Sequence, residues 1–377
     1  MRKVLRSRKR PGFLVLALGL PALAIAGCQS IAGIEERHYD PQANGGGGAP
    51  ATAQCTDYCN TVMEACTDTF AVYPSKEVCL GVCALLDPGD PAKAEGTNTV
   101  ACRAKAAKNA ALSGESGDYC PSAGPGGAGK CGEDCDSYCT LYAKVCPETA
   151  SENCAAECPV LLDDGTFDAK KNHDGDTLQC RLVHTGNATL APDEHCWHAT
   201  LAPKPKSPCA IPTPNCDDYC RVVMAACTGD SAVYENEAEC KATCAAFTPG
   251  QSDDQTENTL GCRTYHSYNA LDIATSHCPH AGPGGDGHCG TDNCESYCAL
   301  LQTACATDFA AAFASADACL TACEKVPGAA KESGATLKTA KSGGDSVSCR
   351  LLHLSRALAA PTDPSECQAA IAGTACD

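Results

Sequence analysis

Apolar residues form one long run near the start of this chain, at residues 11–27. The run, PGFLVLALGLPALAIAG, follows the basic stretch MRKVLRSRKR and ends in small residues. A basic region, a short apolar run and a small-residue exit have the layout of a secretory signal. The run is too short to cross a bilayer comfortably. The pattern therefore predicts that residues 1–27 are a signal peptide that directs export.

The end of this segment, Ile25-Ala26-Gly27-Cys28, resembles the lipobox of bacterial lipoproteins. In that family the cysteine is acylated and becomes the mature N-terminus, so the resemblance implies a lipid on Cys28 that holds the protein to a membrane. The next residue is Gln29 rather than Asp, which implies the outer membrane, facing either the periplasm or the surface. The alternative is ordinary cleavage that leaves Cys28 as a spare thiol. Residues 28–54 include a Gly-rich stretch and are predicted to form a flexible tether.

Beyond the tether the polar and apolar pattern is helical. Cysteines recur as C-x3-C, which places both sulfurs on one face of a helix, and stretches such as VACRAKAAKNAAL are rich in helix formers. Cap residues precede each of these helices. Those before the first helix are Asp134, Asn215 and Asn293, and those before the second are Ser75, Asn236 and Ser315. Those before the third are Asn98-Thr99, Asp176-Thr177, Asn258-Thr259 and Asp345-Ser346. Gly, Pro, Asp and Ser separate these stretches. The pattern predicts three short helices in each cysteine-rich segment.

The 32 cysteines after Cys28 fall into four groups of eight. Each group opens C-x3-C-x6-C, continues with a second C-x3-C and closes with three widely spaced cysteines. We name the groups unit one (55–131), unit two (135–209), unit three (216–289) and unit four (294–376). The sequence predicts four tandem repeats and a mainly α, small disulfide-rich fold. Similar features in units one and three suggest that a two-unit module was itself duplicated.

Two helices that each carry C-x3-C resemble the twin C-x3-C helical hairpins of small disulfide-rich proteins. In those proteins nested disulfides join two antiparallel helices, and the resemblance carries no activity with it. Eight cysteines allow 105 pairings, so the connectivity that the resemblance implies is a hypothesis. The implied disulfides are Cys55–Cys83, Cys59–Cys79, Cys135–Cys158, Cys139–Cys154, Cys216–Cys244, Cys220–Cys240, Cys294–Cys323 and Cys298–Cys319.

Composition narrows the class of protein. The sequence has 33 cysteines but one Trp, six Phe and three Met, and small domains short of core commonly rely on disulfides. No C-x-x-C occurs, which excludes the thioredoxin and c-type haem motifs and the commonest zinc spacing. Loss of residues 1–27 removes six basic residues and no acid, which moves the formal charge from −18 to −24. Nucleic acid is therefore a poor partner, and membrane contact is expected through the lipid.

A G-x-G-x-x-G pattern occurs twice, at Gly124, Gly126 and Gly129 and at Gly282, Gly284 and Gly287. A dinucleotide site needs a preceding strand and a following helix, whereas here cysteines bound the pattern on both sides. The preferred interpretation is a glycine turn closed by a local disulfide, Cys120–Cys131 or Cys278–Cys289.

Histidines provide the main candidate chemistry. Units two and three share them at identical spacings, and the first of each set follows C-R-x-x: the sets are His184, His195 and His198, and His266, His277 and His280. Imidazoles on a rigid scaffold can bind zinc, copper or haem iron. Against a site, unit four keeps only His353 of the set, and unit one has Ala106 and Ser122 in the equivalent places. Polar histidines of helices and loops are the preferred interpretation, and no cofactor is predicted.

Tyrosines before the second cysteine and arginines after the sixth recur in every unit. The tyrosines are interpreted as core aromatics. The arginines are interpreted as residues that pair with acids or cap carbonyls within each unit. No catalytic motif is found. We therefore expect a lipid-anchored, non-enzymatic protein of the cell envelope with a binding or structural role, whose envelope or extracellular ligand is unknown. A metal- or haem-binding protein, possibly redox-active, that uses the repeated histidines is the alternative.

Overall fold

The computed structural model describes residues 52–165, 167–202, 206–342 and 344–373. Residues 1–27, Cys28 and most of the tether predicted at 28–54 lie outside these residues, as does Cys376. The described residues form α-helices and short 3-10 helices, and their only β pairing is in isolated bridges. The prediction of a mainly helical, disulfide-rich fold is confirmed. No helix in this part of the chain is long and apolar enough to cross a membrane.

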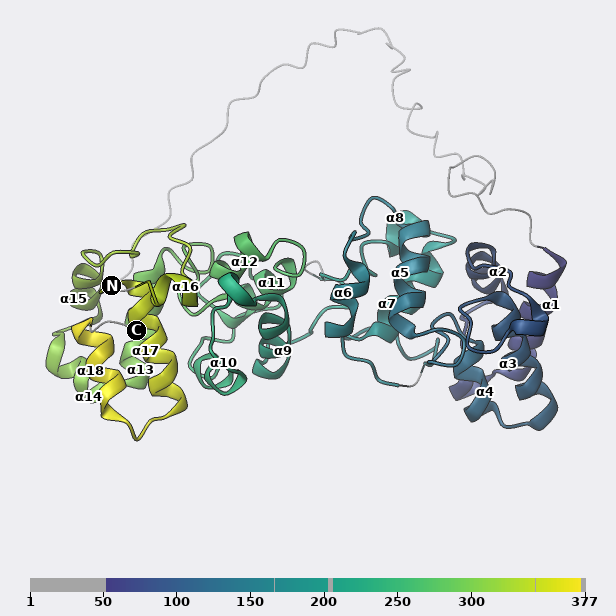
Figure 1. Ribbon diagram of the computed structural model, residues 1–377, viewed down its shortest axis with the longest axis horizontal. Coiled ribbons are helices and arrows are strands. Elements are labelled where there is room, and N and C mark those ends of the chain that lie inside the picture. Colours follow the sequence, from purple (N-terminus) through teal and green to yellow (C-terminus); the bar gives the residue numbers. More distant parts are fainter. Residues whose placement is uncertain (1–51, 166, 203–205, 343, 374–377) are drawn as a thin grey trace, which may run out of the picture. The chain divides into compact units, whose positions relative to one another are not determined.

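The helices of each unit are grouped together in Figure 1. Unit one contains α1 (Ala53–Ala65), α2 (Lys76–Leu85), α3 (Val100–Ser113) and α4 (Ser116–Ala123). Unit two contains α5 (Asp134–Val145), α6 (Cys154–Glu157), α7 (Leu178–Ala188) and α8 (Pro192–His195). Unit three contains α9 (Cys216–Ala226), α10 (Glu237–Cys244), α11 (Leu260–Asn269) and α12 (Ala274–Ala281). Unit four contains α13 (Asn293–Ala304), α14 (Ala306–Ala312), α15 (Ala316–Cys323), α16 (Leu337–Ala340), α17 (Val347–Ala359) and α18 (Pro364–Ala372). Short 3-10 helices are η1 (Asp68–Phe70), η2 (Pro91–Lys93), η3 (Cys158–Val160) and η4 (Gly229–Ser231).

Most of the predicted caps begin a helix. Side chains of the N-cap residues accept a hydrogen bond from the backbone of the first turn at Ser75, Thr99, Thr177, Asn215, Asn236, Thr259, Ser315 and Ser346. Asp134 and Asn293 were predicted as caps, but each is the first residue inside its helix. Their side chains instead accept from Ala128 N and Asp286 N. The two side chains therefore tie down the glycine turn that precedes the helix.

Nested disulfides join the first helix of each unit to the segment that follows it. All eight pairs that the hairpin resemblance implies are present: Cys55–Cys83, Cys59–Cys79, Cys135–Cys158, Cys139–Cys154, Cys216–Cys244, Cys220–Cys240, Cys294–Cys323 and Cys298–Cys319. Residues four apart face the same side of a helix, so two C-x3-C pairs can form two bonds, and the nested order seen here requires that the two segments run antiparallel. The bonds replace much of the apolar core that the composition lacks.

The predicted local bonds Cys120–Cys131 and Cys278–Cys289 are wrong. Cys120 bonds to Cys66, and Cys131 bonds to Cys102. The same order recurs as Cys146–Cys196 with Cys180–Cys209 and as Cys227–Cys278 with Cys262–Cys289, and unit four has Cys305–Cys367. Cys349 is disulfide-bonded as well. The seventh cysteine lies on or beside a helix that packs against the first helix in units one, three and four, so its sulfur faces the third cysteine rather than the eighth.

That helix was not among the three that the sequence predicted for each unit, and we call it the fourth helix; unit four also contains α14 and α16 beyond the predicted three. The fourth helix is α4, α8, α12 and α18 in units one to four. In units one and three it contains a proline, Pro121 or Pro279, and runs into a glycine turn, so its sequence is typical of a loop. Each of these prolines is the sixth of eight residues, where it removes only one intrahelical hydrogen bond. The disulfide to the first helix holds this short segment in place.

Buried tyrosines and arginines fix the fourth helix further. The hydroxyls of Tyr58, Tyr138, Tyr219 and Tyr297 donate to the carbonyl three residues after the seventh cysteine, at Ala123, Ala199, Ala281 and Ala370. Guanidinium groups bind the next carbonyls: Arg103 at Gly124, Arg181 at Thr200, Arg263 at Gly282 and Arg350 at Ile371. The tyrosines are at most 1% exposed. The predictions of core tyrosines and carbonyl-capping arginines are confirmed.

Candidate metal centres

The three histidines of unit two lie together. His184 comes from α7, His195 is the last residue of α8 and His198 follows it. The Nδ1 atom of His184 is 2.9 Å from Nδ1 of His195 and 3.2 Å from Nδ1 of His198. Their nearest ring nitrogens all lie within 4.8 Å of one another. His184 is buried, whereas the other two are half-buried.

Unit three repeats this arrangement with His266 on α11 and His277 and His280 on α12. The Nδ1 atoms of His266 and His277 are 3.1 Å apart. The ring centroids of His266 and His280 are 4.9 Å apart, and the three side chains again place a nitrogen within 4.8 Å of one another. Nδ1 of His280 is buried and has no hydrogen-bond partner. The structure therefore brings both predicted histidine sets together.

Local sequence explains this convergence. In each unit the first histidine stands four residues after the sixth cysteine and therefore on the same face of the third helix. The other two stand one residue before and two residues after the seventh cysteine, so the disulfide at Cys196 or Cys278 places them. The third and fourth helices of a unit pack side by side, so the ring of the first histidine faces the rings of the other two.

Hydrogen bonding determines the tautomer of the central ring. Nε2 of His184 lies 3.0 Å from the carbonyl oxygen of His173, and Nε2 of His266 lies 3.3 Å from that of Gln255. A carbonyl can only accept, so Nε2 carries the proton and the lone pair of the neutral ring is on Nδ1. A second-shell carbonyl of this kind is typical of metal-binding histidines. In unit two this one lone pair faces two neighbouring Nδ1 atoms and cannot accept two good hydrogen bonds at once.

Burial keeps these rings neutral. Desolvation lowers the pKa of His184 to about 4 and that of His266 to about 4. Desolvation, followed by the nearby His288, lowers the pKa of His280 to about 3. The pKa values of His195, His198 and His277 are also lowered, chiefly by desolvation. Unprotonated nitrogens are available to a metal ion at neutral pH.

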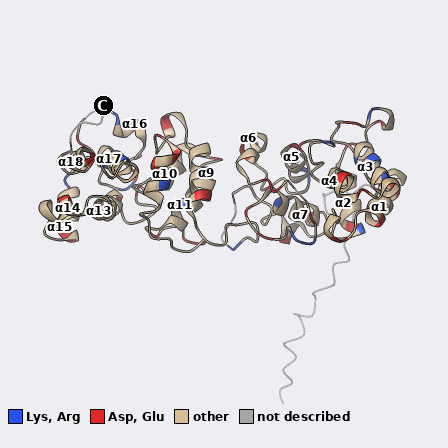
Figure 2. Ribbon diagram, turned by 90° about the horizontal axis from the view of Figure 1, so that it is seen from below, with Lys and Arg blue, Asp and Glu red and all other residues tan. Residues whose placement is uncertain are grey.

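Cysteines and carboxylates do not complete these groups. Sγ atoms of Cys180 and Cys209 lie close to His184, and those of Cys262 and Cys289 close to His266, but each pair forms a disulfide. Figure 2 shows Asp and Glu (red) spread over the helices and loops of the described chain. None of them joins either three-histidine group within 4.8 Å among the described residues. The available donors are therefore imidazoles.

The other two units show what the fold does without the triad. In unit four, Nδ1 of His353 lies 2.6 Å from Oε2 of Glu366. Glu366 precedes the seventh cysteine, as His195 and His277 do. This pairing was not predicted from the sequence, although the spacing of the two residues could have indicated it. Unit one has Ala106 and Ser122 at the positions equivalent to the first and third histidines of the triad. The triad is therefore not required to build a unit.

The stability of the metal-free protein is expected to fall as the pH drops from about 6.5 toward about 4. The folded pKa values of His184 and His266 are lowered to about 4 and that of His280 to about 3, so the unfolded chain binds more protons in this window. Their contribution to stability is present above pH 6.5 and is lost as the pH falls. Thermal melting in chelator would measure it, and His280→Gln should flatten the dependence. A melting temperature that increases as the pH is lowered through this window would contradict the prediction.

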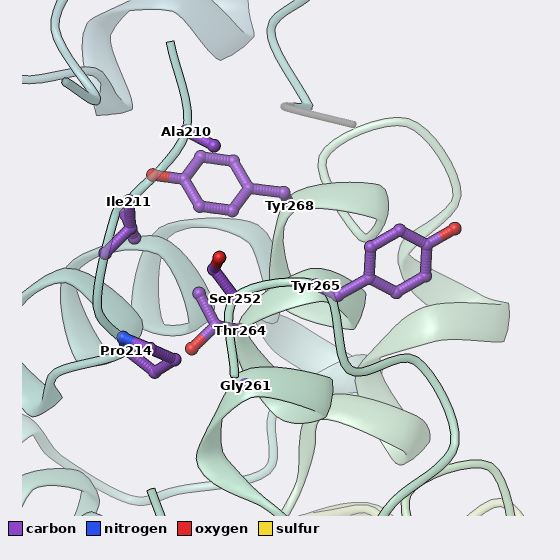
Figure 3. Close-up of a pocket in the computed structure, with 8 residues that line it drawn as sticks. All are labelled: Ala210, Ile211, Pro214, Ser252, Gly261, Thr264, Tyr265 and Tyr268. Carbon is purple, nitrogen blue, oxygen red and sulfur yellow. The ribbon is translucent and has the colours of Figure 1, made fainter. Parts of the chain in front are cut away.

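A small cavity lies near one centre but is not part of it. It is lined by Ala210, Ile211, Pro214, Ser252, Gly261, Thr264, Tyr265 and Tyr268, and holds about 20 Å³. Figure 3 shows Tyr268 turned toward Ala210 and Ile211, with Tyr265 directed away from them. The space is enough for about one water molecule. The cavity offers no set of converging ionisable donors.

Comparisons with known proteins address part of the chain. Residues 206–294 match the BfoA family C-terminal domain. This stretch contains all of unit three with its histidine centre, and it covers less than a third of the chain. No curated protein and no solved structure matches. The chain is thus a cysteine-rich helical protein in which one stretch is similar to the BfoA family C-terminal domain.

Proposed function

We propose that this chain is an exported, lipid-anchored, non-enzymatic protein of the cell envelope that binds two transition-metal ions, one in unit two and one in unit three. The observation that carries the proposal is the convergence of three imidazoles in each unit, whose ligand nitrogens lie within 4.8 Å of one another. The Nδ1 atom of the first histidine is 2.9 and 3.2 Å from those of its two neighbours in unit two and 3.1 Å from that of His277 in unit three. Neutral imidazole suits zinc, copper and nickel. Ligands of a tetrahedral zinc ion at 2.0–2.1 Å stand about 3.3 Å apart, which is close to the observed spacing.

The comparison between units supports a ligand-binding role for the histidines. A purely structural histidine set would be expected wherever the same helices pack. Unit four packs them with one His353–Glu366 pair, and unit one does so without histidines. Desolvation, followed by the neighbouring imidazoles, lowers the pKa of His280, and its buried Nδ1 is left without a hydrogen-bond partner. A bound cation would remove both costs.

A bare metal ion fits these groups better than haem. Iron lies in the plane of the haem macrocycle, and two axial imidazoles bind it from opposite faces, about 4 Å apart nitrogen to nitrogen when each Fe–N bond is about 2 Å. The Nδ1 atoms of His184 and His195 are only 2.9 Å apart. No macrocycle can stand between atoms at that separation. The haem alternative is therefore not part of the proposal.

Metal content of the oxidised, mature protein tests the proposal. We expect about two ions of zinc or copper per chain by elemental analysis after dialysis, and no free thiols by thiol titration, because the described cysteines are disulfide-bonded. Full-length protein that takes up no zinc, copper or nickel when these are added would overturn the proposed function. A single bound ion per chain would limit the proposed metal binding to one of the two centres.

The lipid anchor requires its own experiment. Replacing Cys28 by Ala is expected to move the protein from the membrane fraction to the soluble fraction, since no helix of the described residues could replace the anchor. Fractionation of cells with immunoblotting measures this, and replacing the neighbouring Gln29 by Asn is the matched control. Membrane association that survives Cys28→Ala would refute lipid attachment at this residue.

A further inference from the structure

The two histidine centres differ in the residue that stands before the eighth cysteine. In unit three this residue is His288, next to Cys289, and in unit two it is Pro208, next to Cys209. The ring of His288 stacks on that of His280 with 3.7 Å between centroids, and its centroid is 6.0 Å from that of His266. Pro208 has no side-chain nitrogen to offer. Among the described residues, a fourth imidazole makes ring contacts with the triad in unit three but not in unit two. In unit two, desolvation lowers the pKa of His184 and His173 lies near enough to contribute, and the backbone carbonyl of His173 accepts from that ring.

A fourth donor matters because three protein ligands leave one position of a tetrahedral ion unfilled. Structural zinc sites use four protein ligands, whereas sites with three keep a water or another exchangeable ligand. In unit two no other His, Asp or Glu among the described residues joins the triad within 4.8 Å. His195 and His198 are half-buried, so this side of the group reaches solvent.

His288 is placed to reach the remaining position in unit three. Its side chain is 36% exposed, and its Nε2 lies 3.8 Å from Oε1 of Glu332. It is outside the group whose nitrogens lie within 4.8 Å of one another, so a turn of this partly exposed ring is needed to bring a nitrogen to the ion. Cys289, which follows it, is bonded to Cys262 on the helix of His266, and this bond keeps the ring over the triad.

Resting on the metal-binding function proposed above, we propose that His288 supplies the fourth ligand in unit three, whereas the ion in unit two keeps an exchangeable fourth position. The unit-three ion is then closed to small molecules, and the unit-two ion accepts a small anion or a nitrogen donor from solution. The class of ligand is set by the metal: monodentate donors such as azide, cyanide or free imidazole.

Cobalt(II) as the added metal and azide as the probe can separate the two centres in the full mature chain. His266→Ala leaves only the unit-two centre, and azide should change its visible cobalt spectrum. His184→Ala leaves only the unit-three centre, and azide should not change its spectrum. The double variant His184→Ala/His288→Ala should regain the azide response and should bind cobalt at least about tenfold more weakly than His184→Ala.

Several outcomes distinguish this inference from the function on which it rests. Wild-type protein that binds no cobalt overturns metal binding and the inference together. If wild-type protein binds two ions but His266→Ala and His184→Ala respond equally to azide, the inference alone is overturned. The same holds if azide leaves the cobalt spectrum of His184→Ala/His288→Ala unchanged. His353→Ala, at the equivalent helix position of unit four, is the control and should leave cobalt content and azide response unchanged. Circular dichroism and thiol titration confirm that each variant is folded and oxidised.

Discussion

Replacing His184 by Ala is expected to abolish metal binding in unit two and to leave one ion per chain. His184 is the shared member of its centre, because its Nδ1 lies 2.9 Å and 3.2 Å from those of the other two rings. Its loss leaves two half-exposed donors. Changes to outer-shell partners alone cost 10- to 100-fold in metal affinity, so removal of this ligand should cost more than about 100-fold.

Trp197 provides the measurement for this variant. It is the only tryptophan of the sequence, and its ring centroid is 3.9 Å from that of His198. Copper(II) or nickel(II) bound in unit two should therefore quench the fluorescence of the protein, whereas metal in unit three should contribute little. His184→Ala should remove the quenching and His266→Ala should retain it. Quenching that survives His184→Ala but disappears in His266→Ala would contradict the assignment of the centres.

Removing the Cys146–Cys196 disulfide by replacing both cysteines with Ala is expected to lower the stability of the metal-free protein by about 4 kcal/mol. Its sequence separation is 50 residues, and longer closed loops lose more entropy when they are cross-linked. The same variant should lose the unit-two ion. Cys196 stands between His195 and His198, and the four residues of α8 are too few to form a helix without tertiary support.

The hairpin disulfide Cys139–Cys154 of the same unit is the matched control. It closes 15 residues, so its removal should cost about 3 kcal/mol. The histidines are not attached to it, and the unit-two ion should remain. Chemical denaturation gives the stability of each double variant, and elemental analysis gives its metal content. Retention of both ions without Cys146–Cys196 would show that Tyr138 and Arg181, which also bind the segment after α8, hold it sufficiently.

Part of the candidate site could be read from spacing. The two sets of three histidines were identified because units two and three repeat them at the same distances from the sixth and seventh cysteines. Spacing could not show that their Nδ1 atoms converge, nor that His288 stacks on His280. The position of Glu366 directly before the seventh cysteine could have indicated its pairing with His353, but not its geometry. Each of these contacts joins different helices or a helix and a loop, and the packing of the fourth helix decides it.

The glycine turn in unit three shows the same division. Its flanking cysteines, Cys278 and Cys289, are near neighbours in sequence and were therefore paired with each other. In the fold, Cys278 faces Cys227, 51 residues away, because α12 packs on α9. Local proximity favours a bond in an unfolded chain. Helix packing overrides that preference in the native protein.

By itself the sequence determined the helical class and the starts of eight helices, which depend on neighbours within one or two helical turns, where capping side chains act directly. The nested disulfides between the two C-x3-C pairs followed from the resemblance to helical hairpins, since they join residues 15 to 29 apart. Only the tertiary structure decided the fourth helix of each unit, the disulfides of the third and sixth cysteines and the meeting of the histidines. Those features join groups up to 62 residues apart, and their geometry is set by the buried tyrosines, arginines and sulfurs that pack the fourth helix against the first and the third.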